Sequence, residues 1–513
     1  MNTSHSVSES PELFGHPRGL FILFLTEMWE RFSFYGMKAL LIFYLVKYHL
    51  FTDDAGYSVV GSYAAMVYAM PVIGGYLADK YLGFRKAVLF GGVLLVLGHI
   101  GMAYEGNAAT AMADGMIERD KFALNVFYFS LSLIILGVGF LKANISSIVG
   151  ELYTENDERR DSGFTIFYMG INLGSFLATI LCSWLGETYG WSYGFGAAGI
   201  GMIFGLITFI YGTKYFEGKG EPKDPAKLQE KVFGLISREW LIYLLSVISL
   251  GAVWIFIQNH KLVEGLLIVA SVGSLLFIIW QLTKATRVER DRLIALTILI
   301  IFSVVFWALF EQAYTSMNLF AERSIDRHIM GIEVPAGSFL SLNALFIILF
   351  APAFAWIWIF LDKKHMQPNT GIKFGLAIVF VALGFGALVM GGSLAEAGKV
   401  GAMWLVLAYL LHTWGELCLS PVGLSSVTKL SPSGIVGFMM GVWFLATAGA
   451  EYVAALLAQL ASIETAAGEI PDVVAATNSY IELFYKLFVV GGIIGLVLLA
   501  SSPFIKKLMH GVK

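Results

Sequence analysis

Long apolar runs separated by short polar stretches organise this 513-residue chain. A helix that spans the hydrocarbon core of a bilayer needs about 20 mostly apolar residues. We therefore expect an all-α polytopic membrane protein. Fourteen runs predict helices at residues 20–48, 57–78, 85–104, 122–150, 162–186, 191–212, 239–258, 263–283, 292–319, 337–361, 372–392, 400–429, 434–461 and 478–508.

A polar stretch rich in Lys, Glu, Pro and Gly divides these helices into groups of six, two and six. Two equivalent groups of helices indicate a twofold repeat, which is common in membrane transport proteins. The expected division is a tail at 1–19, a six-helix bundle at 20–212, a linker at 213–238, a two-helix insertion at 239–291, a second bundle at 292–508 and a tail at 509–513.

Composition supports the membrane assignment, because 57% of the residues are hydrophobic and only 14% are charged. The net charge of -3 argues against a nucleic-acid partner. Cys182 and Cys418 lie inside apolar runs, so we expect neither a disulfide framework nor a metal site, and no cofactor. The polar residues 1–16 lack the pattern of a cleavable signal peptide.

Lysine and arginine predict the orientation, because both are enriched in cytoplasmic loops. If the helices alternate and the N-terminus is inside, most of the 34 Lys and Arg fall on the cytoplasmic side. They cluster in the 214–238 linker and at 284–292. Both termini are therefore expected in the cytoplasm.

Charged residues also occur inside the predicted helices, where each costs about 2.5–3.5 kcal/mol and needs a partner or a wet cavity. Glu27 and Arg31 lie one turn apart on the first helix, with Glu30 beside them. Lys142 on the fourth helix is the expected partner of Glu30. The acids of the second half are Glu311 and Glu416.

A cavity with cations on one wall and a carboxylate on the other suits a zwitterion of fixed length, such as a peptide. Moving a cation away from a carboxylate changes its proton affinity, so proton binding and ion-pair breaking can be one event. Three alternatives stay open: ion pairs that only fix helix registry, a Lys142 that extends to the interface, and a Glu311 that reaches water. His99 and His412 are more simply explained as buried structural residues, although His412 lies one turn from Glu416.

Four motifs resemble the proton-coupled oligopeptide transporters, a family of the major facilitator superfamily. They are Glu27-x-x-Glu30-Arg31-Phe32-Ser33-Phe34-Tyr35-Gly36, residues 167–175 (FYMGINLGS), Phe306-Trp307 with Phe310-Glu311-Gln312, and Glu416-Leu417-x-Leu419-Ser420-Pro421. The loop at 74–86 (GGYLADKYLGFRK) is similar to the loop that joins helices two and three throughout that superfamily. The resemblance implies a major facilitator fold of two six-helix bundles with the two extra helices of prokaryotic members, in a bacterial inner membrane.

The same resemblance implies roles for individual residues. Proton coupling is implied for Glu27, Glu30 and Glu311, with Glu311 paired to a first-helix cation at an outer gate. Asp79 paired with Arg85 is implied at an inner gate. Substrate contacts are implied for Arg31 and Lys142 (peptide carboxylate), Glu416 (peptide amino group), Asn172 and Asn343 (peptide backbone), the aromatic residues Tyr35, Tyr68, Trp307 and Trp443 (side-chain pockets), and Ser420.

We therefore predict a symporter that imports di- and tripeptides with protons by alternating access. A symporter of nitrate or another small anion is the first alternative; it would need Arg31 and Lys142 but not Glu416. A non-transporting membrane sensor of the same fold is the second. An enzyme is not expected, because the intramembrane acids lack a metal-ligand or nucleophile-base pattern. Oligomer formation is possible but nothing in the sequence indicates it.

Overall fold

The computed structural model describes residues 12–154, 157–232, 234–463 and 472–512, and nearly all of them are helical. Thirteen helices are long and apolar enough to cross a membrane. Helix α1 (Arg18–Phe43) is also long enough to span a membrane. It is not counted among the thirteen because it contains several buried acidic and basic residues. Within the described residues, the structure therefore confirms the expected six, two and six arrangement.

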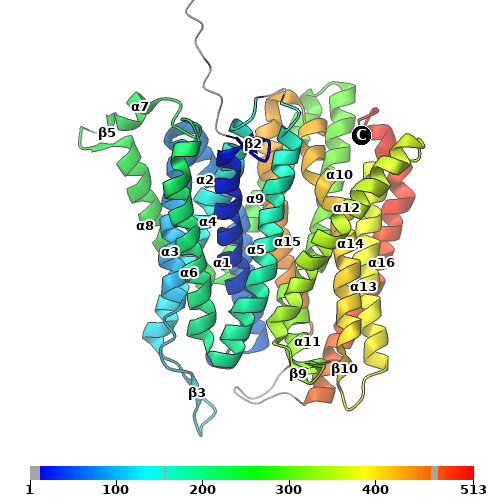
Figure 1. The fold of residues 1–513 in the computed structure, drawn as a ribbon. Coiled ribbons are helices and arrows are strands. Elements are labelled where there is room, and N and C mark those ends of the chain that lie inside the picture. The colour runs from blue at the N-terminus through cyan, green and yellow to red at the C-terminus, as the bar shows by residue number, and fades with distance from the viewer. Residues whose placement is uncertain (1–11, 155–156, 233, 464–471, 513) are drawn as a thin grey trace, which may run out of the picture.

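The N-terminal bundle consists of six helices that pack on one side of the molecule in Figure 1. Short π-helical turns extend α1 to Tyr48 and α2 to Leu82. The helices are α1, α2 (Asp53–Leu77), α3 (Phe84–Met102), α4 (Lys121–Glu151), α5 (Arg160–Tyr189) and α6 (Trp191–Gly212).

The linker and the insertion follow this bundle. The linker contains a 3₁₀ turn (Thr213–Tyr215), the short helix α7 (Pro225–Gln229) and the hairpin of β5 (Lys231–Val232) with β6 (Ile236–Ser237). The insertion consists of α8 (Arg238–Gln258), which packs against α4, and α9 (His260–Lys284), which packs against α15 and α2.

The C-terminal bundle begins at α10, five residues before the predicted boundary at 292. Thr286 and Glu289 form a reciprocal capping box there, which lets the charged segment after Thr286 start the helix. The bundle contains α10 (Arg287–Phe310), a 3₁₀ turn (Glu311–Tyr314), α11 (Ser316–Ser324), a 3₁₀ turn (Ala336–Leu340), α12 (Ser341–Lys363), α13 (Thr370–Ser393), α14 (Ala402–Leu430), a 3₁₀ turn (Ser433–Ile435), α15 (Val436–Gln459) and α16 (Val473–Leu508).

The remaining strands are two-residue pieces at the ends of the molecule. They are β1 (Glu12–Leu13) with β2 (His16–Pro17), β3 (Thr110–Ala111) with β4 (Ile117–Glu118), β7 (Ile325–Asp326) with β10 (Val400–Gly401), and β8 (His328–Ile329) with β9 (Ile332–Glu333). Figure 1 shows that α1 begins and α16 ends at one end of the molecule, while β3, α11 and β9 lie at the other. We call these the terminal end and the far end.

Close backbone contacts hold each bundle together. A Cβ at Gly74 of α2 would overlap the Gly139 carbonyl oxygen of α4, and one at Gly174 of α5 would overlap the Met28 carbonyl oxygen of α1. Helices in lipid associate mainly through such van der Waals packing, which small residues permit. Helix α4, which carries Lys142, is therefore packed tightly against α2, and α5, which carries Asn172, against α1.

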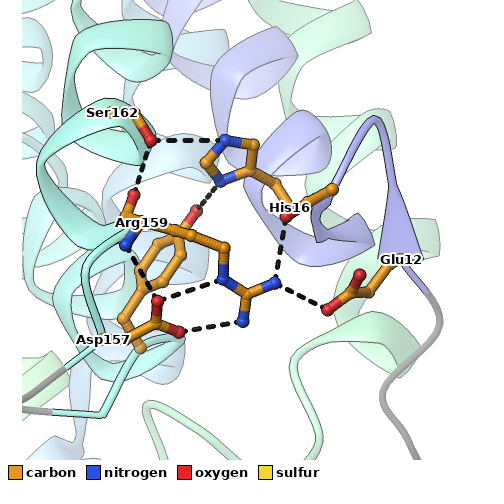
Figure 2. A network of polar contacts seen from close by, with 7 residues as sticks. Glu12, His16, Asp157, Arg159 and Ser162 are labelled. Atoms are coloured by element: carbon orange, nitrogen blue, oxygen red, sulfur yellow. Dashed lines mark hydrogen bonds and ion pairs between the residues drawn. The ribbon is translucent and has the colours of Figure 1, made fainter.

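A polar network anchors the β1–β2 hairpin to the loop between α4 and α5 at the terminal end (Figure 2). His16 Nδ1 lies 2.8 Å from the Tyr153 hydroxyl, and Arg159 bonds Glu12, the Gly15 carbonyl and Asp157. Hydrogen bonds from Arg159 lower the pKa of Asp157. The network lies within the N-terminal bundle, so it positions the start of α1 without touching the other bundle.

Candidate functional site

A cavity of about 250 Å³ lies in the middle of the molecule, between α1, α2 and α5 of the N-terminal bundle and α10, α12 and α14 of the C-terminal bundle. Aromatic, amide and acidic side chains line it, as is typical of a small-molecule site. Its polar and aromatic lining residues are Tyr35, Tyr68, Tyr168, Asn172, Ser175, Trp307, Phe310, Glu311, Tyr314, Asn343, Tyr409, His412, Glu416 and Ser420.

A second hollow of about 160 Å³ adjoins this cavity. Tyr68, Trp307 and Glu311 line both spaces, and Trp443 lines only the second. Eight of the ten residues for which the resemblance implied substrate contacts therefore lie on the walls of these two spaces; the exceptions are Arg31 and Lys142.

Glu416 is the acidic group of the C-terminal wall. The Asn343 side-chain amide donates a hydrogen bond of 2.9 Å to Glu416 Oε2 and lies 3.1 Å from the Thr413 hydroxyl. This bond orients the carboxylate without neutralising its charge. No ion pair to Glu416 occurs among the described residues, so a cation bound in the cavity would be its first charged partner.

Lys142 is the corresponding cation of the N-terminal bundle. Its ammonium lies 4.0 Å from the centroid of the Tyr68 ring, behind the cavity wall. It has no hydrogen bond or ion pair to any residue that the structure describes, and the attraction to an aromatic face compensates only part of a buried charge. The side chain is held at the ring of Tyr68, which decides against the alternative that it extends to the interface.

Glu30 does not pair with Lys142, and this expectation is wrong. Arg31 Nε hydrogen-bonds Glu30 Oε2 and lies 3.2 Å from Glu27 Oε1, with all three side chains almost fully buried. Adjacent positions on α1 bring Glu30 within reach of Arg31, which therefore pairs with both acids locally. Glu27 Oε2, Glu30 Oε1 and Arg31 Nη2 remain buried without a hydrogen-bond partner among the described residues. Arg31 does not line the cavity in this conformation; Tyr35, one turn further along α1, does.

Lys38 links the two bundles beside the cavity. Its ammonium lies 2.9 Å from Glu311 Oε2 and 3.1 Å from Glu451 Oε1, and 4.3 Å from the Tyr314 ring centroid. The Lys38 side chain is 2% exposed. The expected pair between Glu311 and a first-helix cation is present, which decides against a Glu311 that reaches water.

Further contacts between the bundles extend from Lys38 toward the far end. Arg323 of α11 forms two hydrogen bonds, of 2.6 and 2.8 Å, with Asp53 at the start of α2. Lys47 pairs with Glu322, and Glu187 of α5 accepts hydrogen bonds from the backbone before α12. These contacts between the bundles lie at the cavity or beyond it, toward the far end. The structure is therefore closed at the far end.

The predicted inner-gate pair of Asp79 with Arg85 is wrong for this conformation. Asp79 Oδ1 lies 2.6 Å from Lys223 Nζ, and Arg85 lies 2.5 Å from Glu221. The linker packs against the turn between α2 and α3, because Arg85 N also donates to the Gly220 carbonyl. Asp79 and Arg85 thus each form an ion pair with an oppositely charged residue of the linker.

Sequence reasoning missed Glu451 and the tyrosines at 168, 314 and 409. Glu451 is a single acid in the long apolar helix α15, so the cost of a charge in the membrane would have identified it as readily as Glu416. Tyrosines carry no comparable signal, because a tyrosine in an apolar helix is as common in packing as in a cavity wall. His412 lies on the cavity wall against Phe385, whereas His99 is buried beside α6.

Known proteins share the same architecture. Residues 85–474 match the POT family. The chain is 38% identical to the peptide transporter YePEPT of Yersinia enterocolitica, over 89% of this chain and 90% of that protein, and 35% identical to a di-/tripeptide transporter of Lactococcus lactis, over 98% of both. A crystal structure of the peptide transporter POT in complex with alafosfalin, 37% identical, covers 98% of each chain with a TM-score of 0.79. This chain therefore belongs to the POT family of membrane transporters, as its sequence motifs indicated.

Proposed function

We propose that this protein imports di- and tripeptides together with protons by alternating access. Lys142 and Glu416 carry the argument: they are opposite charges from opposite bundles, and neither has an ion-pair partner within the described residues. A peptide zwitterion brings a carboxylate for one and an ammonium for the other. The relatives named as peptide transporters support this assignment.

The walls between these charges suit a peptide backbone of variable sequence. Asn172 and Asn343 are amides on facing walls that can bond backbone groups, and Tyr35, Tyr68 and Trp307 offer aromatic surface to apolar side chains. We therefore expect broad side-chain tolerance and recognition of the two peptide termini.

The buried acids supply the coupling. Opening the far end must separate Lys38 from Glu311 and Glu451, which leaves two carboxylates without their cation. A carboxylate that loses its paired cation binds a proton more readily. Proton binding and opening of the far end thus favour each other, and Glu27 and Glu30 beside Arg31 provide a second acid pair on the N-terminal side.

The charge distribution supports the orientation, because Lys and Arg cluster in the linker and at 284–292. With both termini in the cytoplasm of a bacterial cell and the helices in the inner membrane, the far end faces outward. The structure is then the state that has closed behind an incoming substrate.

Uptake into liposomes tests the function. Purified protein should take up labelled dialanine faster with an inward proton gradient, and excess unlabelled dipeptide should block this uptake. Nitrate at the same concentration serves as the competitor for the alternative function. Block by nitrate and not by dipeptide would show a small-anion carrier, and no gradient-dependent uptake from folded protein would favour a sensor.

Glu416→Gln tests the site. Truncating one partner of a buried charge pair costs about 2–5 kcal/mol, so apparent dipeptide affinity should fall at least about tenfold. Glu264→Gln is the matched control, because Glu264 is an acid of α9 in the insertion, away from the cavity. Equal uptake by wild type and Glu416→Gln across several dipeptides would refute the assignment of Glu416.

A further inference from the structure

A third cavity, of about 480 Å³, opens at the terminal end of the C-terminal bundle. It lies where α12 ends, α13 begins, and α14 and α16 end, so it is separate from the central site. Its lining residues are Asp362, His365, Gln367, Pro368, Asn369, Thr370, Lys373, Val422, Lys429, Lys506, Met509, Gly511 and Val512.

Two largely buried residues line this cavity with polar atoms that remain open to it. Lys373 is 7% exposed and Thr370 is 6% exposed. Neither side chain makes a hydrogen bond or ion pair with any residue that the structure describes. The Lys373 ammonium lies 4.9 Å from the Trp358 ring centroid, which orients it but leaves its hydrogen-bonding protons unused. A buried ammonium in this condition is stabilised by an anion.

The surrounding charges favour an anion as well. Lys506 is exposed and stands at the rim, and Asp362 is the acid among the lining residues. Asn369 caps α13, so the positive end of that 24-residue helix also borders the cavity.

The position of the cavity indicates the class of anion. Lys373 lies one turn inside α13, where a spanning helix leaves the apolar core and meets the layer of lipid headgroups. Basic pockets between helices on the cytoplasmic side recognise anionic lipid headgroups. The volume exceeds what a single small anion would fill and falls in the range of sites for larger organic ligands.

We propose that this cavity binds a phosphate ester, with the phosphate against Lys373 and Thr370 and the headgroup of an anionic phospholipid as its source. A soluble phosphate ester offers the same chemistry and is the other source to be tested. The site differs from the peptide site in location and in ligand; it rests on the cytoplasmic orientation given under the proposed function but not on peptide transport.

Native mass spectrometry of the full-length protein in detergent tests the proposal. The probes are phosphatidylglycerol, phosphatidylethanolamine as the zwitterionic comparison, and glycerol 1-phosphate as the soluble ester. We expect one phosphatidylglycerol per chain to stay bound in preference to phosphatidylethanolamine. Lys373→Met should reduce that bound fraction at least tenfold, and Lys373→Arg should restore most of it.

Lys507→Met is the matched control, because Lys507 is an exposed lysine beside Lys506 that does not line the cavity. Lys506→Met, at the exposed rim, gives a second test should Lys373→Met fail to fold, with an expected loss of severalfold. Displacement of the lipid by glycerol 1-phosphate would support the phosphate site and assign it to a soluble ester. Equal retention of both lipids, or equal binding by Lys373→Met and Lys507→Met, would overturn the proposal.

Discussion

Lys38→Met should shift the protein away from the state that is closed at the far end. Lys38 is the cation between Glu311 and Glu451, and methionine keeps most of its volume while removing the charge. Two carboxylates of the C-terminal bundle would then face the N-terminal bundle without a partner. In the open state the same carboxylates would meet water, so the substitution penalises the closed state specifically.

The structure sets the size of this effect. Removing one partner of a buried ion pair costs about 3–5 kcal/mol, and each 1.4 kcal/mol changes an equilibrium constant about tenfold. The equilibrium between closed and open states should therefore shift by roughly a hundredfold to a few thousandfold. The shift should shrink as the pH is lowered, because each uncompensated carboxylate can take up a proton.

Distance measurement between spin labels can detect this shift. Tyr189 at the end of α5 and Met403 at the start of α14 are exposed at the far end and belong to different bundles. Both native cysteines are buried, so labels on Tyr189→Cys and Met403→Cys should dominate the signal. Lys38→Met should increase the population with the longer distance.

Lys47→Met provides the matched control. Lys47 also joins the bundles, at 2.6 Å from Glu322, but its side chain is 44% exposed, so its ion pair contributes only about 0–1 kcal/mol. An unchanged distance distribution in Lys38→Met would refute the reasoning. An equal change in Lys47→Met would show that any lost charge at this end has the same effect, independent of burial.

Three further predictions concern closure and the N-terminal hairpin. A side chain at Gly61 of α2 would overlap Ala455 of α15, so Gly61→Val should hinder closure and lower uptake severalfold. Gly441→Ala should not lower uptake, because the nearest neighbour of Gly441 is 3.9 Å away. Similar uptake by both variants would contradict this explanation. Asp53→Asn leaves Arg323 without its carboxylate partner. The substitution should lower the melting temperature and lengthen the distance between spin labels at positions 189 and 403. Unchanged values in both measurements would show that the pair is not needed for closure. Arg159→Gln should speed proteolysis before α1 but leave uptake unchanged, since its network lies within one bundle; reduced uptake would show that the hairpin takes part in the transport cycle.

The helices could be predicted because apolar runs of that length leave the backbone no alternative in lipid, where every N–H and C=O must be paired. Their ends were less accurate. The prediction began the second helix at 57, whereas α2 begins at Asp53, since Thr52 caps its first turn and two acids there favour a helix N-terminus. Apolar content alone misses such polar first turns.

The sequence also predicted the residues of the candidate site better than their contacts. The cost of intramembrane charge singled out Glu311, Glu416 and Lys142, and each lies on or directly behind the cavity wall. Which charges pair could not be read from the sequence. Asp79 and Arg85 bind the linker instead of each other, because the position of that polar segment depends on packing between distant parts of the chain.

The close backbone packing within each bundle has a consequence for substrate length. Glycines bring α2 against α4 and α1 against α5, so we expect each bundle to move as a unit, with its residues at fixed separations from one another. On the proposed function, Lys142 and Asn172 then form one rigid half-site, and Asn343 and Glu416 form the other. Only the spacing between the two half-sites changes, and it reaches its minimum when the bundles close. A ligand too long for that minimum could still bind an open state but would hold the bundles apart, so peptide length is selected at closure and not at binding.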